Sequence, residues 1–133
     1  MSGTKLSWLT AGGAVIALAA VLFGAQLAGT RHPDPRPGVG ADLVLPPAAV
    51  PRTPGALEAY AAARTAPALL DGIYCHCQCR ENFGHRSLLT CFESDHGANC
   101  DVCMGEAMMA LQLGGQGQSL RQIRRAIDRQ FKS

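Results

Sequence analysis

Apolar residues dominate the chain from Leu6 to Gly29, and no charged side chain interrupts them. A continuous run of this kind is typical of a membrane-spanning helix, for which about 20 residues suffice. Lys5 and Trp8 lie at its beginning, where flanking charges and interfacial rings occur. We predict that residues 1–29 form an uncleaved signal anchor of a single-pass cell-membrane protein, with the C-terminal domain outside the cytoplasm. A cleaved secretory signal is the alternative, although the small residues that a cleavage site requires are poorly spaced.

Residues 30–54 follow a different pattern, because they hold all but one of the chain's eight prolines. Proline fixes φ and lacks a backbone donor, so this density disfavours helices and sheet ladders and favours extended polyproline geometry. We therefore predict a semi-rigid, proline-rich tether. A ligand for a proline-recognition module is the alternative.

Helical periodicity begins after this segment, and we assign residues 55–133 to one cysteine-rich domain. Good helix formers, apolar spacing and capping residues predict its elements. These are a helix over 56–64, a turn that restarts at 69–70, one or two helical turns over 87–92, and a helix over 100–113 capped by Asn99. The stretch 73–79 between them is predicted to be an irregular loop.

The last predicted helix carries the clearest signals. Ser119 and Gln122 match a capping box at its start. Its apolar residues share one stripe, formed by Leu120, Ile123, Ile127 and Phe131. The arginines lie largely off this stripe and predict a solvated face, with a membrane-surface role as the alternative: Arg121, Arg124, Arg125 and Arg129. We expect this helix to brace the domain.

Composition limits the function classes that the chain can serve. It has 133 residues with only 5% aromatics, which is too little for a large enzyme fold, a dinucleotide-binding domain or a barrel. The sequence holds no phosphate-binding loop, nucleophile elbow or paired carboxylates, so we expect no enzymatic activity. A net charge of +2 gives no indication of a nucleic-acid partner. The predicted fold is mostly α: an N-terminal transmembrane helix, a proline-rich tether and a small bundle of short helices around a Cys-x-Cys-x-Cys loop.

Six cysteines lie between residues 75 and 103 and are the main candidates for chemistry. They form three sets: Cys75/Cys77/Cys79, Cys91 alone, and the helical i, i+3 pair Cys100/Cys103. The macrodipole at a helix start favours thiolate over thiol for the last pair. Thiolates together with imidazole suit Cu(I) and Zn(II). The ligands predicted for a soft metal ion are Cys75, Cys77, Cys79, Cys91, His96, Cys100 and Cys103.

The run from Tyr74 to Cys79 resembles the signature of the bacterial PCYCGC-motif proteins, and the resemblance covers about residues 73–131. It continues in three further segments: 85–92, 95–103 and 119–128. Tyr74, His76 and Gln78 stand where the signature has proline, tyrosine and glycine, and His76 adds a possible ligand. The family implies a small exported or lipid-anchored protein, with an uncleaved helix in place of the lipid anchor here. It implies an architecture rather than an activity.

Three functions compete. The first is a membrane-tethered extracytoplasmic protein that binds copper or zinc for storage, sensing or delivery, with a metal-delivery protein as partner. The second is a disulfide-stapled structural or interaction module, in which the Cys-x-Cys-x-Cys run pairs with downstream cysteines because it cannot easily pair within itself. The third is thiol–disulfide exchange through Cys100 and Cys103, although a thioredoxin-like pattern is absent. We favour metal binding.

Overall fold

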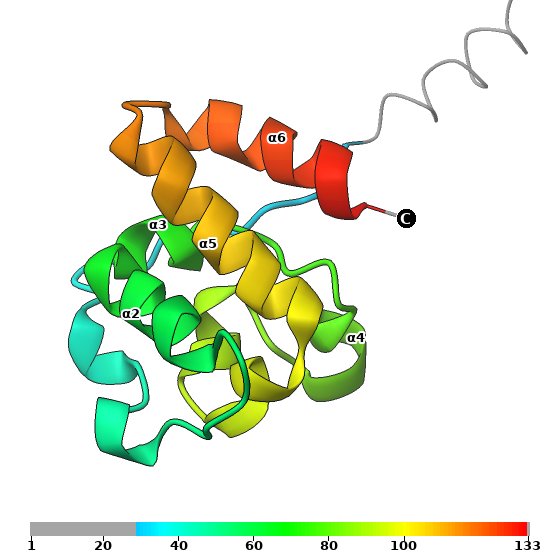
Figure 1. Cartoon of the computed structure of the whole chain (residues 1–133). Helices are drawn as coiled ribbons and strands as arrows, with labels where there is room; N and C mark the ends of the chain where they lie inside the picture. Colours follow the sequence, from blue (N-terminus) through cyan, green and yellow to red (C-terminus); the bar gives the residue numbers. More distant parts are fainter. Residues whose placement is uncertain (1–28, 133) are drawn as a thin grey trace, which may run out of the picture. The chain divides into compact units, whose positions relative to one another are not determined.

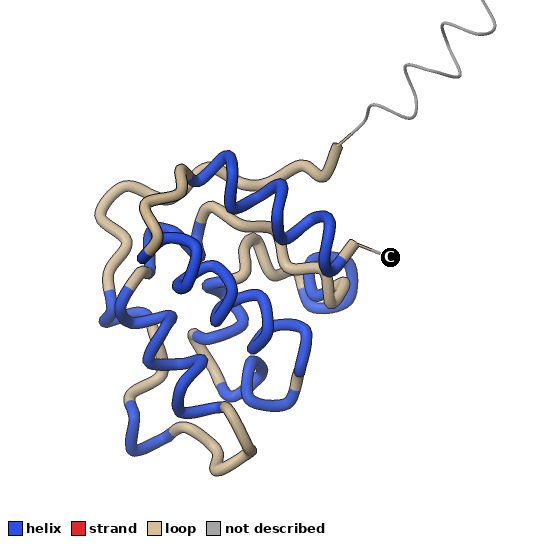
Figure 2. Tube along the Cα trace, turned by 45° about the horizontal axis from the view of Figure 1, so that its top comes forward, coloured by secondary structure: helices blue, strands red, loops and turns tan. Residues whose placement is uncertain are grey.

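Helices make up the regular structure of this protein, whose computed structural model describes residues 29–132. No strand occurs within that range (Figure 2). The α-helices are α2 (Ala56–Thr65), α3 (Pro67–Asp71), α4 (Cys79–Phe83), α5 (Asp101–Gly115) and α6 (Leu120–Phe131). The 3₁₀ helices are η1 (Ala41–Leu43), η2 (Pro47–Ala49), η3 (Leu89–Phe92) and η4 (Asp95–Asn99). Residues 31–133 group into one compact unit.

The structure corrects the membrane part of the predicted fold class and localisation. Within the described residues, no helix is long and apolar enough to cross a membrane. The longest, α5, has 15 residues, whereas a span needs about 20. The segment predicted to be the signal anchor, residues 1–29, lies outside the described range except for Gly29. The fold class that the structure supports is therefore a small, mostly helical, cysteine-rich domain.

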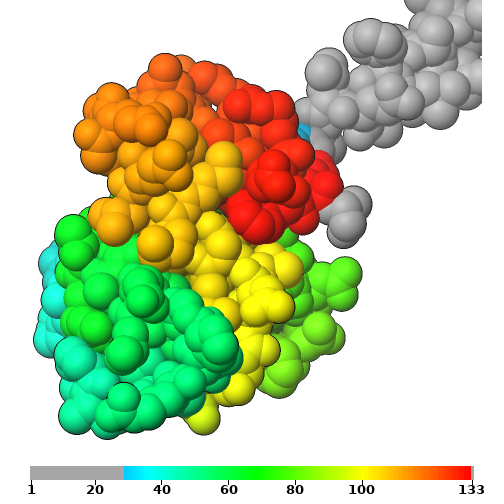
Figure 3. Space-filling view, viewed as in Figure 1, coloured from blue at the N-terminus to red at the C-terminus, as the bar shows by residue number. Residues whose placement is uncertain are grey.

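Helix α5 lies at the centre of this domain. It packs against α2 on one side and α6 on the other (Figure 1). Ala59 and Ala63 of α2 and Ala107 and Ala110 of α5 are completely buried, and such small side chains allow two helices to approach closely. In Figure 3 the side chains of α5 reach the surface in a band between α2 and α6. The first turn of α5 points toward the cysteine-rich loops and thereby positions Cys103.

The predicted α2, α5 and α6 are present, with small shifts at their ends. The N-cap of α5 is Cys100 rather than Asn99, which instead closes η4. The turn predicted at 69–70 belongs to α3, which begins at Pro67, because the missing N–H of proline lies at a position that needs no intrahelical partner. Helices α4 and η4 were not predicted, since neither has an apolar period that the sequence could show.

The predicted proline-rich tether is wrong, because its residues pack on the domain. Val44 and Val50 are buried, and the Leu45 amide donates to the Phe92 carbonyl at 2.9 Å. The Leu45 carbonyl in turn accepts from Arg64 Nη1 at 2.8 Å. Proline removes backbone donors but leaves carbonyl acceptors and the branched side chains between prolines available for packing. The segment is therefore part of the folded unit.

A buried carboxylate fastens the proline-rich segment to the domain. Asp71 is fully buried and accepts from the Arg36 amide at 2.6 Å and from the Arg36 guanidinium at 2.9–3.2 Å. Arg86 Nη1 and Ser87 Oγ each donate to it at 2.8 Å. Burial alone would raise the pKa of Asp71, but the hydrogen bonds and charge of Arg36, with help from Ser87, outweigh it and lower the pKa to about 2. The carboxylate is thus held ionised inside the protein.

Helix α6 begins as the sequence predicts. The side chains of Ser119 and Gln122 form a reciprocal capping box, and Ile123 and Ile127 are buried. Arg124 departs from the predicted solvated face, because its guanidinium donates to two backbone carbonyls far away in the sequence. The distances are 2.7 Å to Gly72 O and 2.6 Å to Pro33 O.

Candidate metal centre

The cysteine-rich loop begins at Ile73, whose carbonyl accepts from the Leu88 amide at 2.8 Å. It ends where α4 begins at Cys79. Gln78 immediately before α4 has φ +61°, and among the described residues it is the non-glycine residue with a left-handed backbone. The run is therefore a tight turn rather than an extended strand, and this turn directs its cysteines to one side.

Cys77 and Cys79 are joined by a disulfide. This pairing lies within the run that the sequence predicts not to pair easily with itself. The left-handed Gln78 brings the two Cα atoms to 5.4 Å, which lies within the ordinary range for a disulfide. Cys75, Cys91, Cys100 and Cys103 are free.

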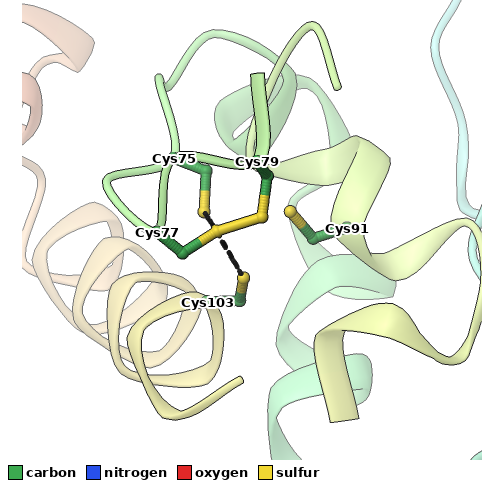
Figure 4. A group of neighbouring side chains, drawn as sticks. All are labelled: Cys75, Cys77, Cys79, Cys91 and Cys103. Carbon is green, nitrogen blue, oxygen red and sulfur yellow. Dashed lines mark hydrogen bonds between the residues drawn. A yellow bond between two sulfur atoms is a disulfide. The ribbon is translucent and has the colours of Figure 1, made fainter. Parts of the chain in front are cut away.

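Five cysteines from three separate segments converge beside the start of α5 (Figure 4). Cys75 Sγ lies 3.2 Å from Cys77 Sγ and 3.4 Å from Cys103 Sγ, and Cys103 Sγ lies 3.4 Å from Cys77 Sγ. Four of the five are buried, and Cys77 is partly exposed. We call this set the inner group; its members are Cys75, Cys77, Cys79, Cys91 and Cys103, whose sulfur atoms all lie within 4.8 Å of one another.

The environment of the inner group favours the thiol form of its free cysteines. The pKa values of Cys75, Cys91 and Cys103 are all raised above the ordinary value of a cysteine. Hydrogen bonds among these sulfur atoms are the largest influence and act in both directions, and burial adds an upward shift. The thiolate predicted at Cys103 is therefore not favoured, because hydrogen bonds with neighbouring sulfur atoms together with burial raise the pKa of this thiol.

A second set of donors adjoins the inner group and shares two of its cysteines. His96 Nε2 lies 3.1 Å from Cys79 Sγ, and His85 Nδ1 lies 3.3 Å from Cys91 Sγ. We call the set Cys79, His85, Cys91 and His96 the outer group; its four donor atoms also lie within 4.8 Å of one another. Burial, followed by the nearby His96, lowers the pKa of His85, which favours the neutral imidazole that a metal requires.

Not every predicted ligand joins these groups. Cys100 lies outside both, and its Sγ accepts from the Cys103 amide at 3.5 Å as the N-cap of α5. His76, considered as an additional ligand, points toward α6 instead, where its Nε2 lies 2.9 Å from Asp128 Oδ1. His32 Nε2 lies 3.1 Å from the same carboxylate oxygen. His32 therefore links the proline-rich segment to α6, and His76 links the cysteine-rich loop to the same helix.

Glu106 is not indicated by the sequence as a site residue, and His85, a histidine between the cysteine sets, is not among the predicted ligands. Glu106 is fully buried in α5; its Oε1 accepts from the His76 amide at 3.0 Å, while Oε2 has no hydrogen-bond partner among the described residues. Burial raises the pKa of Glu106 to about 7, and the Cys75 thiol and the His76 amide offset part of this effect. A signal existed in its position three residues after Cys103, on the same helix face. For His85 the signal is its place between the cysteine sets, but the loop that holds it has no period that would select it as a ligand.

Helix η4, which carries His96, is held from two sides. Tyr60 Oη donates to the Ser94 carbonyl at 2.6 Å and accepts from the Ala98 amide at 3.2 Å. On the other side, Gly97 packs closely against the main chain of η3. A Cβ at Gly97 would lie 2.9 Å from the Cys91 carbonyl oxygen. The position of the histidine relative to Cys91 is therefore set by main-chain contact.

Gln78→Gly is expected to stabilise the protein by about 0.5–1 kcal/mol. A left-handed conformation costs a non-glycine residue about 1–2 kcal/mol, and glycine removes this cost. The greater freedom of glycine in the unfolded chain offsets part of the resulting stabilisation. Urea unfolding of wild type and variant measures the difference. Gln112→Gly, at an exposed position of α5, is the matched control and should instead cost about 1 kcal/mol. A destabilised Gln78→Gly would contradict the positive φ.

The described residues thus form a small helical, cysteine-rich protein with two adjoining groups of donors that could hold a metal ion. The family model described as "Protein of unknown function with PCYCGC motif" matches residues 40–133, and the chain belongs to this family. The match begins well before the cysteine loop and includes part of the proline-rich segment that packs on the domain. Comparisons with curated proteins and with solved structures gave no match.

Proposed function

We propose that this protein binds a soft metal ion, Cu(I) or Zn(II), and serves storage, sensing or delivery of that ion rather than catalysis. The observation that carries the proposal is the inner group, in which five cysteine sulfur atoms from distant parts of the chain lie within 4.8 Å of one another. Packing apolar side chains does not require such a gathering, whereas a metal ion does.

The donor type supports a soft ion. The inner group offers sulfur alone, and thiolates prefer Cu(I) and Zn(II) over hard cations such as Mg²⁺ or Ca²⁺. A tetrahedral zinc site with Zn–S bonds of about 2.3 Å separates its sulfur atoms by about 3.8 Å. The observed separations of 3.2–3.4 Å are slightly shorter, so small side-chain movements suffice to admit an ion.

Charge supports the same proposal. Thiols with raised pKa values lose their protons when a cation replaces them, so ion binding releases protons from the inner group. Glu106 adds a buried carboxyl group behind Cys75 and raises the pKa of that thiol through its charge. A bound cation would offset part of the negative charge of the thiolates and of this carboxylate.

The Cys77–Cys79 disulfide must be reduced before these two sulfur atoms can bind an ion as thiolates. The reduction takes up two electrons and two protons and breaks the S–S bond, for which a dithiol reductant supplies both and becomes a disulfide itself. The oxidised protein would then be the form with fewer ligands.

The competing functions fit the geometry less well. A module stapled by three disulfides would leave no free cysteine, whereas four are free. Thiol–disulfide exchange through Cys100 and Cys103 requires an accessible thiol of low pKa, yet Cys103 is fully buried and its pKa is raised.

The proposal is tested on anaerobically purified, reduced protein. We expect stoichiometric binding of Cu(I) or Zn(II) in competition with a chromophoric chelator, and a loss of affinity of at least 100-fold in Cys103→Ser, because this side chain contacts two other sulfur atoms.

Cys100→Ser is the matched control, since Cys100 lies outside both donor groups but in the same helical turn; its affinity should change by less than threefold. Circular dichroism verifies that both variants fold. If the reduced wild type binds no ion, or if both variants lose affinity equally, the proposal is refuted.

A further inference from the structure

We propose that the outer group is a second ion position, which takes a divalent borderline cation such as Zn(II) and exchanges it with solvent while the inner group retains its ion. This proposal rests on the proposed function, because the two positions share Cys79 and Cys91. It adds His85 and His96 as a pair of ligands and assigns the two groups different roles.

The donor atoms of the outer group already lie close to a metal-binding arrangement. The ring of His96 faces Cys79 through Nε2 at 3.1 Å, and the ring of His85 faces Cys91 through Nδ1 at 3.3 Å. The two imidazole rings lie edge to face, with centroids 4.8 Å apart and an interplanar angle of 72°. Two sulfur and two nitrogen donors are the usual set for tetrahedral zinc.

Charge favours a divalent ion at this position. With both positions filled, five thiolates and two neutral imidazoles carry a combined charge of −5, so two Zn(II) ions leave a net charge of −1. A monovalent ion at the outer position would leave −2. The divalent ion therefore leaves less uncompensated charge at a partly buried site.

Access to solvent differs between the two groups. A pocket of about 460 Å³ opens at the outer group, with Cys79, His85 and His96 in its wall together with Asp95 and Asn99. Of the three cysteines that belong to the inner group alone, Cys75 and Cys103 do not line this pocket, whereas Cys77 reaches its wall. An ion held by His85 and His96 therefore borders water, whereas an ion held by Cys75 and Cys103 lies behind it.

The shared cysteines give the two positions a fixed relation. Cys79 and Cys91 would bridge the ions, which leaves Cys75, Cys77 and Cys103 as the remaining ligands of the inner ion. Three terminal sulfur atoms and at least one bridge complete four-coordination there. Both positions thus reach a full ligand set from the donors that the structure brings together.

The experiment is a titration of the reduced, anaerobic full chain with Zn(II), in wild type, in the double variant His85→Ala/His96→Ala and in His32→Gln. His32 is the matched control, because it is a histidine of the same domain that contacts Asp128 and the Tyr74 amide rather than a cysteine. We expect two equivalents of bound Zn(II) in wild type and control and one in the double variant.

Release to a chelator supplies the kinetic readout. Wild type should lose Zn(II) in two phases that differ at least tenfold in rate, and the double variant should retain only the slow phase. Cadmium-113 NMR of the wild type tests the ligands without any substitution: two resonances are expected, one of them correlated with ring protons of His85 and His96.

The outcomes separate the two proposals. If wild type binds no Zn(II) or Cu(I), the proposed function itself fails. If wild type binds ions but the double variant binds the same number with the same release kinetics, or if no cadmium resonance correlates with either histidine, the outer position is refuted while the inner group stands.

Discussion

Asp71→Asn is expected to lower the free energy of unfolding by about 3 kcal/mol. Removing one partner from a buried ion pair typically costs about 3–5 kcal/mol, and the lower end applies because both arginine partners are partly exposed and can be hydrated. The amide cannot accept from Arg36, Arg86 and Ser87 together without turning its own NH₂ group toward a donor. Urea unfolding measures the loss, and hydrogen exchange at residues 36–50 should show that the proline-rich segment opens first.

Glu93→Gln is the control for this variant. Glu93 also pairs with Arg36, at 2.7 Å, but it is 30% exposed and should contribute less than about 1 kcal/mol. Equal losses in the two variants would show that Asp71 does not anchor the segment.

The same carboxylate predicts a dependence of stability on pH. The pKa of Asp71 is lowered to about 2 in the folded protein, below its value of about 4 in the unfolded chain. A lowered folded pKa stabilises the protein fully above about pH 4, and this contribution is lost as the pH falls toward 2. Asp71→Asn should therefore flatten the acid limb of the stability profile.

Saturation of the reduced protein with Zn(II) is expected to stabilise it by about 4 kcal/mol when the free ion exceeds its Kd 1,000-fold. For a domain of this size the midpoint of thermal unfolding should rise by roughly 15–30 °C. The reason is that the ligands lie far apart in sequence, from Cys75 to Cys103, so the unfolded chain cannot present them together. Differential scanning calorimetry with and without a chelator measures the shift.

Two controls test the cause of this stabilisation. The oxidised protein, in which the Cys77–Cys79 disulfide withholds two thiolates, should gain much less from the same ion. The gain of the reduced protein should also decrease as the pH falls, because protons compete with the ion for the thiols. An equal gain in oxidised and reduced protein would show that the ion binds elsewhere.

The sequence predicts the longer helices of the fold well. Helical spacing and the capping box of Ser119 and Gln122 locate α2, α5 and α6 to within about two residues. It predicts the irregular parts poorly, because 3₁₀ turns such as η4 have no apolar period. The sequence predicts the proline-rich segment as a semi-rigid tether for a related reason: its attachment depends on Asp71, which is distant in sequence and has the local appearance of a turn residue.

The candidate site was also predicted only in part. Five of the seven predicted ligands converge in the inner group, His96 joins the outer group, and Cys100 remains aside. Spacing along the chain indicates which cysteines are neighbours in sequence, but only the packing of α5 against the loop brings Cys103 to Cys75. His85 and Glu106 acquire their places from tertiary contacts, and for this reason composition and spacing did not select His85.

The tight contact at Gly97 has a further consequence for the outer group. Because the main chain of η4 rests directly on the Cys91 carbonyl, the distance between the two segments that carry His96 and Cys91 depends on no flexible side chain. The entropy of bringing these donors together is lost during folding rather than during ion capture. The position is thus preorganised, and a methyl group added at residue 97 would disturb it without altering a single ligand.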